Sequence, residues 1–172
     1  MELLKADLSD FERIKSFYKN LCENTVGIEK YARWIYGVYP TDEIIKNYIE
    51  SGEMFYSEEN GLIISALALT CQNADYHNVA WSRQFNDEEV TVIHLLGVSP
   101  EHQKSGLARF AVRAIIEKSK KAEKKSVRLD ALMSNKPAQR LYEKSGFIKR
   151  DKKRWYAENT GTTEFLLYEL IL

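Results

Sequence analysis

One stretch decides the fold of this chain: Val98-Ser99-Pro100-Glu101-His102-Gln103-Lys104-Ser105-Gly106-Leu107-Ala108. It follows an apolar run and leads directly into apolar residues at helical spacing, which predicts a strand, a short Gly/Ser loop and a helix. Several backbone N–H groups at such a helix start lack intrahelical partners, and the positive end of the helix dipole adds to them. Gly106 lets the backbone approach an anion closely, and Ala108 keeps the first turn narrow. The stretch therefore predicts a site for a phosphate or pyrophosphate.

Two common phosphate loops do not match. A Walker loop requires Gly-x4-Gly-Lys-Ser/Thr, and a dinucleotide fingerprint requires Gly-x-Gly-x-x-Gly, whereas this stretch has only Gly106. The remaining pattern is Gln-x-x-Gly-x-Ala, from Gln103 to Ala108. A second block follows further along the chain: Asn135-Lys136-Pro137-Ala138-Gln139-Arg140-Leu141-Tyr142-Glu143-Lys144-Ser145-Gly146-Phe147.

In this order the two blocks resemble the two hallmark motifs of the GNAT superfamily of acyl-CoA-dependent N-acetyltransferases. The resemblance is close from about 90 to 147 and looser at both ends, and Lys104, Ser105 and Ala108 depart slightly from the frequent residues. It implies an α/β (α+β) fold with a single mixed, mostly antiparallel twisted sheet flanked by helices. Two central strands would splay apart where the pantetheine arm of coenzyme A enters. It also implies acetyl-CoA as cosubstrate and no metal.

Composition argues against several other classes of function. The 172 residues suit a single domain, 1–172, and the apolar content of 44% indicates a globular protein. The 25 basic and 25 acidic residues balance, and the basic runs at 118–128 and 149–154 include acidic residues, so we expect no nucleic-acid partner. Cys22 and Cys71 are too few for a disulfide framework, and no signal peptide or membrane span is evident. These features favour a cytoplasmic protein without a membrane partner.

The remaining elements follow from periodicity and turn residues. Ser9 and Glu12 form a predicted capping box, Thr41 a predicted helix cap, and Asn60-Gly61 a hairpin turn. Gly97 indicates a bulge or a close backbone approach in the strand 90–98. We expect strands at 3–6, 54–58, 62–71, 90–98, 127–132, 147–150, 155–158 and 164–172, a short strand near 79–82 in an irregular loop, and helices beginning near 9, 31, 41, 107 and 137.

The resemblance implies that coenzyme A binds to the two motifs and to the end of the strand that precedes them. Backbone groups of a bulged strand at Leu96-Gly97-Val98 would bind the pantetheine amides and the acetyl oxygen; ordinary sheet pairing is the alternative. Asn135 would contact the coenzyme or serve as a helix-start residue. The residues expected to bind coenzyme A are Leu96, Gly97, Val98, Gln103, Lys104, Ser105, Gly106, Leu107, Ala108, Asn135, Ala138 and Tyr142.

Tyr142 and His94 are the candidate catalytic residues. The resemblance implies that Tyr142 protonates the coenzyme A thiolate, whereas a tyrosine in an amphipathic helix is otherwise a core residue. His94 is predicted by alternation to share a strand face with Val92, Leu96 and Val98, where it could relay a proton from the amine; a buried structural histidine is the alternative. The other acids considered for the base are Glu88, Glu89, Glu101 and Asp130.

The function that follows is transfer of an acetyl group from acetyl-CoA to a primary amine of a small molecule or peptide, by direct attack in a ternary complex. A ribosomal-protein N-terminal acetyltransferase is one subcase, and a non-catalytic acyl-CoA sensor is the alternative. The acceptor stays unknown, and a homodimer is an oligomeric state that the sequence leaves open. Aromatic residues expected near the acceptor are Trp34, Tyr36, Tyr39, Trp81, Trp155 and Tyr156.

Overall fold

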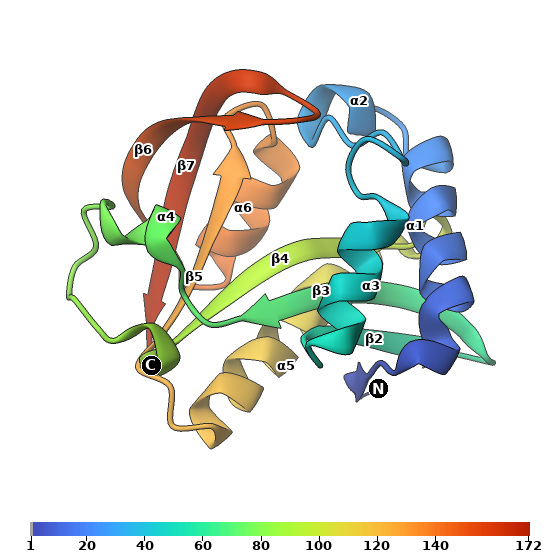
Figure 1. Ribbon diagram of the computed structural model, residues 1–172, viewed down its shortest axis with the longest axis horizontal. Helices are drawn as coiled ribbons and strands as arrows, with labels where there is room; N and C mark the ends of the chain where they lie inside the picture. Colours follow the sequence, from blue (N-terminus) through green and yellow to red (C-terminus); the bar gives the residue numbers. More distant parts are fainter. Residues whose placement is uncertain (1) are drawn as a thin grey trace.

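A mixed seven-stranded sheet forms the centre of the protein, which we describe from a computed structural model covering residues 2–172 (Figure 1). The strand order is β1-β2-β3-β4-β5-β7-β6; β4 and β5 are parallel and every other neighbouring pair is antiparallel. This confirms the predicted fold class. The strands are β1 Leu4–Lys5, β2 Met54–Glu59, β3 Leu62–Thr70, β4 Val90–Val98, β5 Ser126–Leu132, β6 Ile148–Ala157 and β7 Gly161–Ile171.

Helices cover both faces of the sheet (Figure 1). On one face, Ile14 and Tyr18 of α1 pack with Ile45 of α3 against the small residues Ala66 and Ala68 of β3. On the other face, apolar residues of α5 and α6 pack against β3, β4 and β5. The helices are α1 Phe11–Asn24, α2 Ile28–Tyr31, α3 Asp42–Glu50, α4 Ala74–His77, α5 Leu107–Lys121 and α6 Lys136–Lys144, with 3-10 turns at Leu8–Asp10, Asp87–Glu89 and Pro100–His102.

Several predicted local features are confirmed. Thr41 Oγ1 accepts the N–H of Ile44 at 3.2 Å and caps α3. Asn60 and Gly61 both have positive φ, as the predicted two-residue hairpin requires. The first capping box is different from the prediction, because Asp7 and Asp10 form it instead of Ser9 and Glu12. The reason is that a 3-10 turn precedes α1 and moves the helix start back along the chain.

Two strand predictions were wrong. The segment near 79–82 forms no strand, because it follows the short helix α4 and its Trp81 packs inward with Tyr76 and Val90. The segments predicted at 147–150 and 155–158 are one continuous strand, β6. Its charged residues, which obscured the apolar alternation, lie at the sheet edge where solvent covers one side.

The central parallel pair separates along its length. β4 and β5 pair only through Val90–Val92 and Ser126–Arg128, and beyond these residues the two strands are no longer neighbours in the ladder. The pairing of β4 with β3 shifts register over the same part of β4, and Leu95 there has a φ of 54°. The splay predicted from the resemblance is therefore present, with the bulge at Leu95.

The bulge lies two residues earlier than Gly97, where we had expected it. Gly97 pairs with Ala66 and instead provides the close approach that was its alternative: a Cβ there would lie 2.5 Å from Cδ2 of Leu21 in α1. The bulge also breaks the predicted alternation. His94 stacks on Tyr48 of α3, whereas Leu96 packs with the α5 and α6 cluster.

Candidate active site

A cavity of about 480 Å³ opens where β4 and β5 separate. The floor comes from the two splayed strands, and the walls come from α4, α6, the β6–β7 hairpin and the segment after α2. Bulge residues and the second sequence block therefore meet in one space. The predicted site residues that line it are His94, Leu96, Asp130, Asn135, Ala138, Tyr142, Trp34, Tyr39, Trp155 and Tyr156.

Tyr142 reaches this cavity from α6 and is almost fully buried. The helix is positioned by Asn135, whose Oδ1 accepts the N–H of Ala138 at 3.2 Å, and it ends before Gly146, which has a φ of 92°. Burial, with a smaller effect of the Asp130 charge, raises the pKa of the Tyr142 hydroxyl well above its usual value. The phenol therefore keeps its proton at neutral pH and can act as a donor.

His94 faces the cavity from β4, one residue before the bulge. Its ring stacks on Tyr48 with centroids 6.0 Å apart, and its Nε2 lies 3.1 Å from Oγ1 of Thr70. Burial lowers the pKa of His94, and the nearby Asp130 charge opposes this shift only in part. The imidazole is consequently neutral at pH 7 and able to accept a proton.

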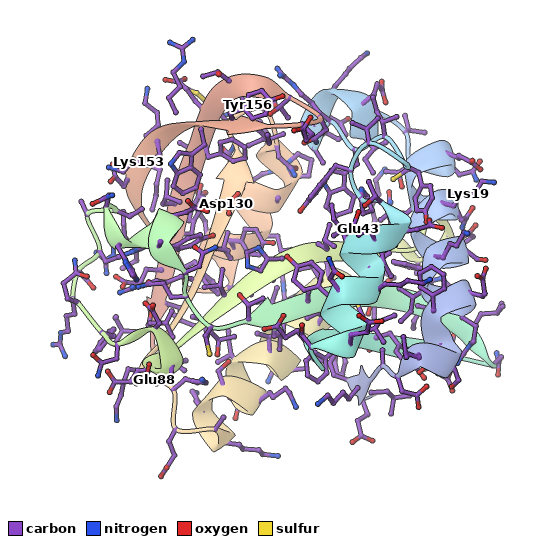
Figure 2. All side chains as sticks on the ribbon, viewed as in Figure 1. Lys19, Glu43, Glu88, Asp130, Lys153 and Tyr156 are labelled. Carbon is purple, nitrogen blue, oxygen red and sulfur yellow. The ribbon has the colours of Figure 1, made fainter. Side chains whose placement is uncertain are left out.

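Asp130 comes from the middle of β5, and its side chain lies near the centre of the molecule in Figure 2. The hydroxyl of Tyr76 donates to its Oδ1 at 2.6 Å. Tyr76 itself is held by stacking on Trp81, with ring centroids 5.6 Å apart. Tyr76 has no signal in the sequence, because the four-residue helix α4 is too short to show periodicity and its partner Asp130 is more than fifty positions away.

The bulge exposes backbone groups beside these side chains. The Tyr18 hydroxyl, from α1, donates to the Leu95 carbonyl at 2.9 Å and so satisfies an acceptor that the distorted ladder leaves unpaired. Leu96, which we expected to contact the coenzyme, lines the cavity, whereas Gly97 and Val98 continue the ladder with β3. The bulge thus separates Leu95 and Leu96, which have no partner in the ladder with β3, from a segment that pairs normally.

The loop predicted to bind phosphate, residues 103–106, lies at the start of α5. Lys104 and Gly106 have φ values of 64° and 92°, both in the left-handed region. Left-handed residues in a turn can direct successive backbone N–H groups toward one concave space. Within residues 2–172, the N–H groups of Lys104, Ser105 and Gly106 have no hydrogen-bond acceptor. A Cβ on Gly106 would meet nothing within 4 Å, which shows that the space before the helix is open. The geometry suits an anion.

Side chains hold this loop in place. Ser105 Oγ donates to the His102 carbonyl at 2.6 Å and accepts the N–H of Leu107 at 3.3 Å. Gln103 Nε2 donates to Oγ1 of Thr25 at 2.9 Å, so the glutamine of the first motif fastens the loop to the end of α1. Gln103 and Ser105, which the resemblance implies bind the coenzyme, both have partners within the protein. Ala108 lies in the first turn of α5, as expected.

A second hollow, also of about 480 Å³, lies beside the loop along α5. Gly106, Phe110 and Ala114 line it together with the basic residues Arg109 and Arg113. These arginines belong to neither motif, although their spacing of four residues places both on one helix face. They add positive charge next to the open N–H groups of the loop.

Other predicted residues lie elsewhere. Tyr36 donates its hydroxyl to Asp42, and Trp81 packs on the buried guanidinium of Arg128, so neither lines the cavity. The alternative acids Glu88, Glu89 and Glu101 also lie outside its lining. Among the described residues, no helix is long and apolar enough to cross a membrane. Likewise, no group of three His, Cys, Asp or Glu in residues 2–172 could hold a metal ion.

Comparisons with known proteins agree with this architecture. The chain is 26% identical over 148 residues to an uncharacterised N-acetyltransferase of Methanocaldococcus jannaschii, covering 86% of this chain but only 59% of the relative. The structure is similar to the ribosomal-protein-S18-alanine N-acetyltransferase of Escherichia coli, with a TM-score of 0.69, 15% identity and coverage of 98% and 92%. It is also similar to a ribosomal-protein-alanine N-acetyltransferase of Brucella melitensis, with a TM-score of 0.71, 16% identity and coverage of 100% of both chains. At these identities, the two structural likenesses show the fold alone.

The model of the acetyltransferase (GNAT) family matches residues 26–147, a range that contains the bulged strand, the phosphate loop and the second motif. Both motifs occupy the places that the resemblance implied, on either side of the splay. The chain belongs to the acetyltransferase (GNAT) family.

Proposed function

We propose that this protein transfers an acetyl group from acetyl-CoA to a primary amine of a small molecule or peptide, with residues 1–172 acting as one domain. One observation carries the proposal: Tyr142 and His94 line a single cavity at the splay, and they carry complementary protonation states. A proton donor and a proton acceptor in one space are what amine acylation requires.

Acetyl-CoA would supply the acetyl group as an activated thioester. The residues present fit it, because the open N–H groups of Lys104, Ser105 and Gly106 suit a diphosphate, and Arg109 and Arg113 add basic charge beside them. The exposed backbone at Leu96 and the small side chain of Ala138 leave room in the cavity for the pantetheine arm. Asn135 serves mainly as a helix cap, so its contact with the coenzyme stays a prediction.

His94 is proposed to remove the proton that keeps the acceptor amine from attacking. A neutral imidazole accepts that proton directly or through one water. The amine nitrogen then bonds to the thioester carbonyl carbon, and the carbon–sulfur bond breaks. One further proton leaves that nitrogen to water, and the last N–H proton stays in the new amide. Because Thr70 Oγ1 contacts Nε2, Nδ1 is the nitrogen that the described contacts leave for this task.

Tyr142 is proposed to give its proton to the departing sulfur. The raised pKa of the hydroxyl keeps the phenol protonated until a thiolate forms nearby. The thiolate receives that proton, and water or the base returns one to the phenol. Together these transfers leave a neutral thiol and a neutral amide, so no charge accumulates in the buried cavity.

The acceptor could be the amino terminus of a ribosomal protein, a subcase supported by the names of the two solved structures with similar folds. A non-catalytic sensor of acyl-CoA is the competing function, but it requires no proton donor at Tyr142. The expectations of a cytoplasmic location and of a homodimer stay predictions.

Two measurements test the proposal. Calorimetry with purified protein is expected to detect acetyl-CoA binding, and a thiol-release assay over a panel of primary amines is expected to detect turnover above hydrolysis. Binding without turnover on any amine or amino-terminal peptide would favour the sensor. No heat on adding acetyl-CoA would contradict both functions.

A further inference from the structure

The cavity has an unusual distribution of charge. Its lining includes two carboxylates, Asp130 and the exposed Asp75, and the imidazole of His94, but no lysine or arginine among the described residues. The chain has 25 basic residues, so their absence from this lining is a property of the site and not of the composition. A ligand that carries an anionic group close to its amine would find no partner here.

Asp130 has unused capacity to accept a hydrogen bond. Its Oδ1 accepts the Tyr76 hydroxyl, but within residues 2–172 no hydrogen bond or ion pair involves its Oδ2. The carboxylate lies in the cavity that also holds His94 and Tyr142, and its charge affects the titration of both. It is therefore near the reacting centre and available to a cation.

Aromatic side chains contribute to the cavity wall on two sides. On the side of α4 and the β6–β7 hairpin, the ring of Trp155 packs at a tilt against those of Tyr76 and Phe165, with centroid separations of 6.0 Å and 5.7 Å. Trp34 and Tyr39 face them from the segment after α2, with centroids 6.2 Å apart. Figure 2 shows Tyr156 on the β6–β7 hairpin, and its side chain is largely exposed. Such faces attract an ammonium and pack on an apolar body.

From these features we propose, resting on the proposed function, that the acceptor is a primary ammonium whose neighbouring group is uncharged, and that Asp130 selects it. Asp130 Oδ2 binds the ammonium, Tyr76 holds the carboxylate in place, and the aromatic wall holds the organic body. A free amino acid is rejected because its carboxylate would lie beside Asp130 with no basic side chain to offset the repulsion. An alkylamine and a peptide amino terminus share the accepted chemistry, since the first peptide carbonyl is neutral.

The first test compares three acceptors with the same ring and amine. Phenethylamine, phenylalaninamide and phenylalanine differ in whether the amine-bearing carbon also carries hydrogen, a neutral amide or a carboxylate. We expect kcat/KM for phenylalanine to be at least about 10-fold below the value for either neutral compound, as for one unpaired charge in a binding site. Equal values for phenylalanine and phenethylamine would overturn the proposal. A peptide that begins with phenylalanine then distinguishes alkylamines from peptide amino termini as acceptors. A much better peptide substrate indicates an extended peptide site.

The second test is the substitution Asp130→Asn, which preserves size and can still accept the Tyr76 hydroxyl. We expect KM for phenethylamine to rise about 10-fold with little change in kcat, and the discrimination against phenylalanine to shrink. Glu43→Gln is the matched control: it removes one negative charge from the exposed face of α3, outside the cavity, and should change neither parameter (Figure 2). A fall in kcat at unchanged KM would assign Asp130 to the chemical step and overturn its selecting role.

Direct binding decides the matter even if none of these amines turns over. Calorimetric titration of the protein, with coenzyme A present, should show tighter binding of phenethylamine than of phenylalanine, and Asp130→Asn should remove the difference. Equal affinities, or no binding of either compound, would overturn the selectivity. Failure of the proposed function looks different, since it would appear as no acetyl-CoA binding and no acetylation of any amine.

Discussion

Two acidic side chains on neighbouring strands, Glu169 of β7 and Asp130 of β5, have very different surroundings. Glu169 is fully buried, and both of its oxygens are occupied: Arg128 contacts Oε1 at 2.8 Å, and Arg150 and the Ser82 N–H contact Oε2 at 2.9 and 3.1 Å. Among the described residues, Asp130 has one hydrogen-bond partner, the Tyr76 hydroxyl, and its side chain lines a cavity.

The difference follows the course of the central strands. Arg128 pairs with Val92 in the last rung that joins β5 to β4, whereas Asp130 lies beyond it, where the strands have separated. In the closed part, polar groups satisfy one another and stabilise the loop between β3 and β4 through Gln72 and the Arg83 carbonyl. In the open part, polar groups line the cavity. One sheet thus combines a structural end with the end that we propose to be reactive.

The largest expected effect is a loss of stability on removing one member of the buried Arg128–Glu169 pair, which lies where β4 and β5 still pair. Arg128→Ala leaves the buried Glu169 charge without its main partner, so we expect the free energy of unfolding to fall by about 3–5 kcal/mol. Urea denaturation at pH 7 measures this. The double substitution Arg128→Met with Glu169→Leu should recover much of the loss, because the only charge left without its partner is that of Arg150, whose side chain is partly exposed to solvent. A loss below about 1 kcal/mol in the single variant would contradict a structural role for this pair.

Where β4 and β5 have separated, removing one polar group should lower enzymatic activity and leave the stability of the fold unchanged. Tyr142→Phe removes the proposed proton donor and is expected to lower kcat about 100-fold while acetyl-CoA affinity and thermal stability stay close to the parent values. Thiol release and calorimetry provide both measurements. Tyr168→Phe is a matched control from the same aromatic cluster, because Tyr168 lies outside the cavity lining. Unaltered turnover in Tyr142→Phe would remove this residue from the mechanism.

The phosphate loop provides a third comparison. Gly106→Glu places a carboxylate at the open N–H groups and should weaken acetyl-CoA binding about 100-fold by repulsion. Gly106→Asn is the control, because asparagine tolerates the positive φ and adds no charge. It should keep affinity within a few fold. Similar losses in both variants would mean that backbone strain, and not charge, explains the effect.

A smaller effect is expected at the bulge. Tyr18→Phe leaves the buried Leu95 carbonyl without a donor, which should cost about 1–3 kcal/mol of the free energy of unfolding. Because Leu95 adjoins His94, kcat/KM should fall as well. Phe17→Leu, at the neighbouring position of α1, is a control for packing alone. Stability equal to that of the parent protein would show that another group satisfies the carbonyl.

The smallest effect concerns pH. Since burial depresses the pKa of folded His94 below 6.5, the unfolded chain binds this proton more readily than the folded protein. The stabilisation is therefore complete above pH 6.5 and is lost as the pH falls from 6.5 through the folded pKa. Thermal melts of the parent protein and of His94→Gln between pH 5 and 8 should show a weaker acid dependence in the variant. Parallel curves would contradict a buried neutral histidine.

Local patterns predicted much of the fold. The strand 90–98, the helix from Leu107 and the Asn60-Gly61 hairpin appear where expected, because alternation, helical spacing and turn residues act over a few neighbouring positions. Tyr142, His94 and Leu96 were also predicted, and the structure brings them into one cavity.

Long-range packing decided the rest. The bulge lies at Leu95 and not at Gly97, because Tyr18 of α1 binds the Leu95 carbonyl and Leu21 packs closely on Gly97. The segment near 79–82, predicted as a strand, instead follows α4, and its Trp81 stacks on Tyr76, whose hydroxyl donates to Asp130. These contacts join residues far apart in the chain, so no local pattern encodes them.

The sequence by itself determined the family, the order of the main elements and the loop that starts at the end of β4, since each depends on residues close together in the chain. Only the tertiary structure decided which polar groups are satisfied and which remain free. Whether a carboxylate becomes structural, like Glu169, or stays available, like Asp130, depends on the donors that other segments place beside it.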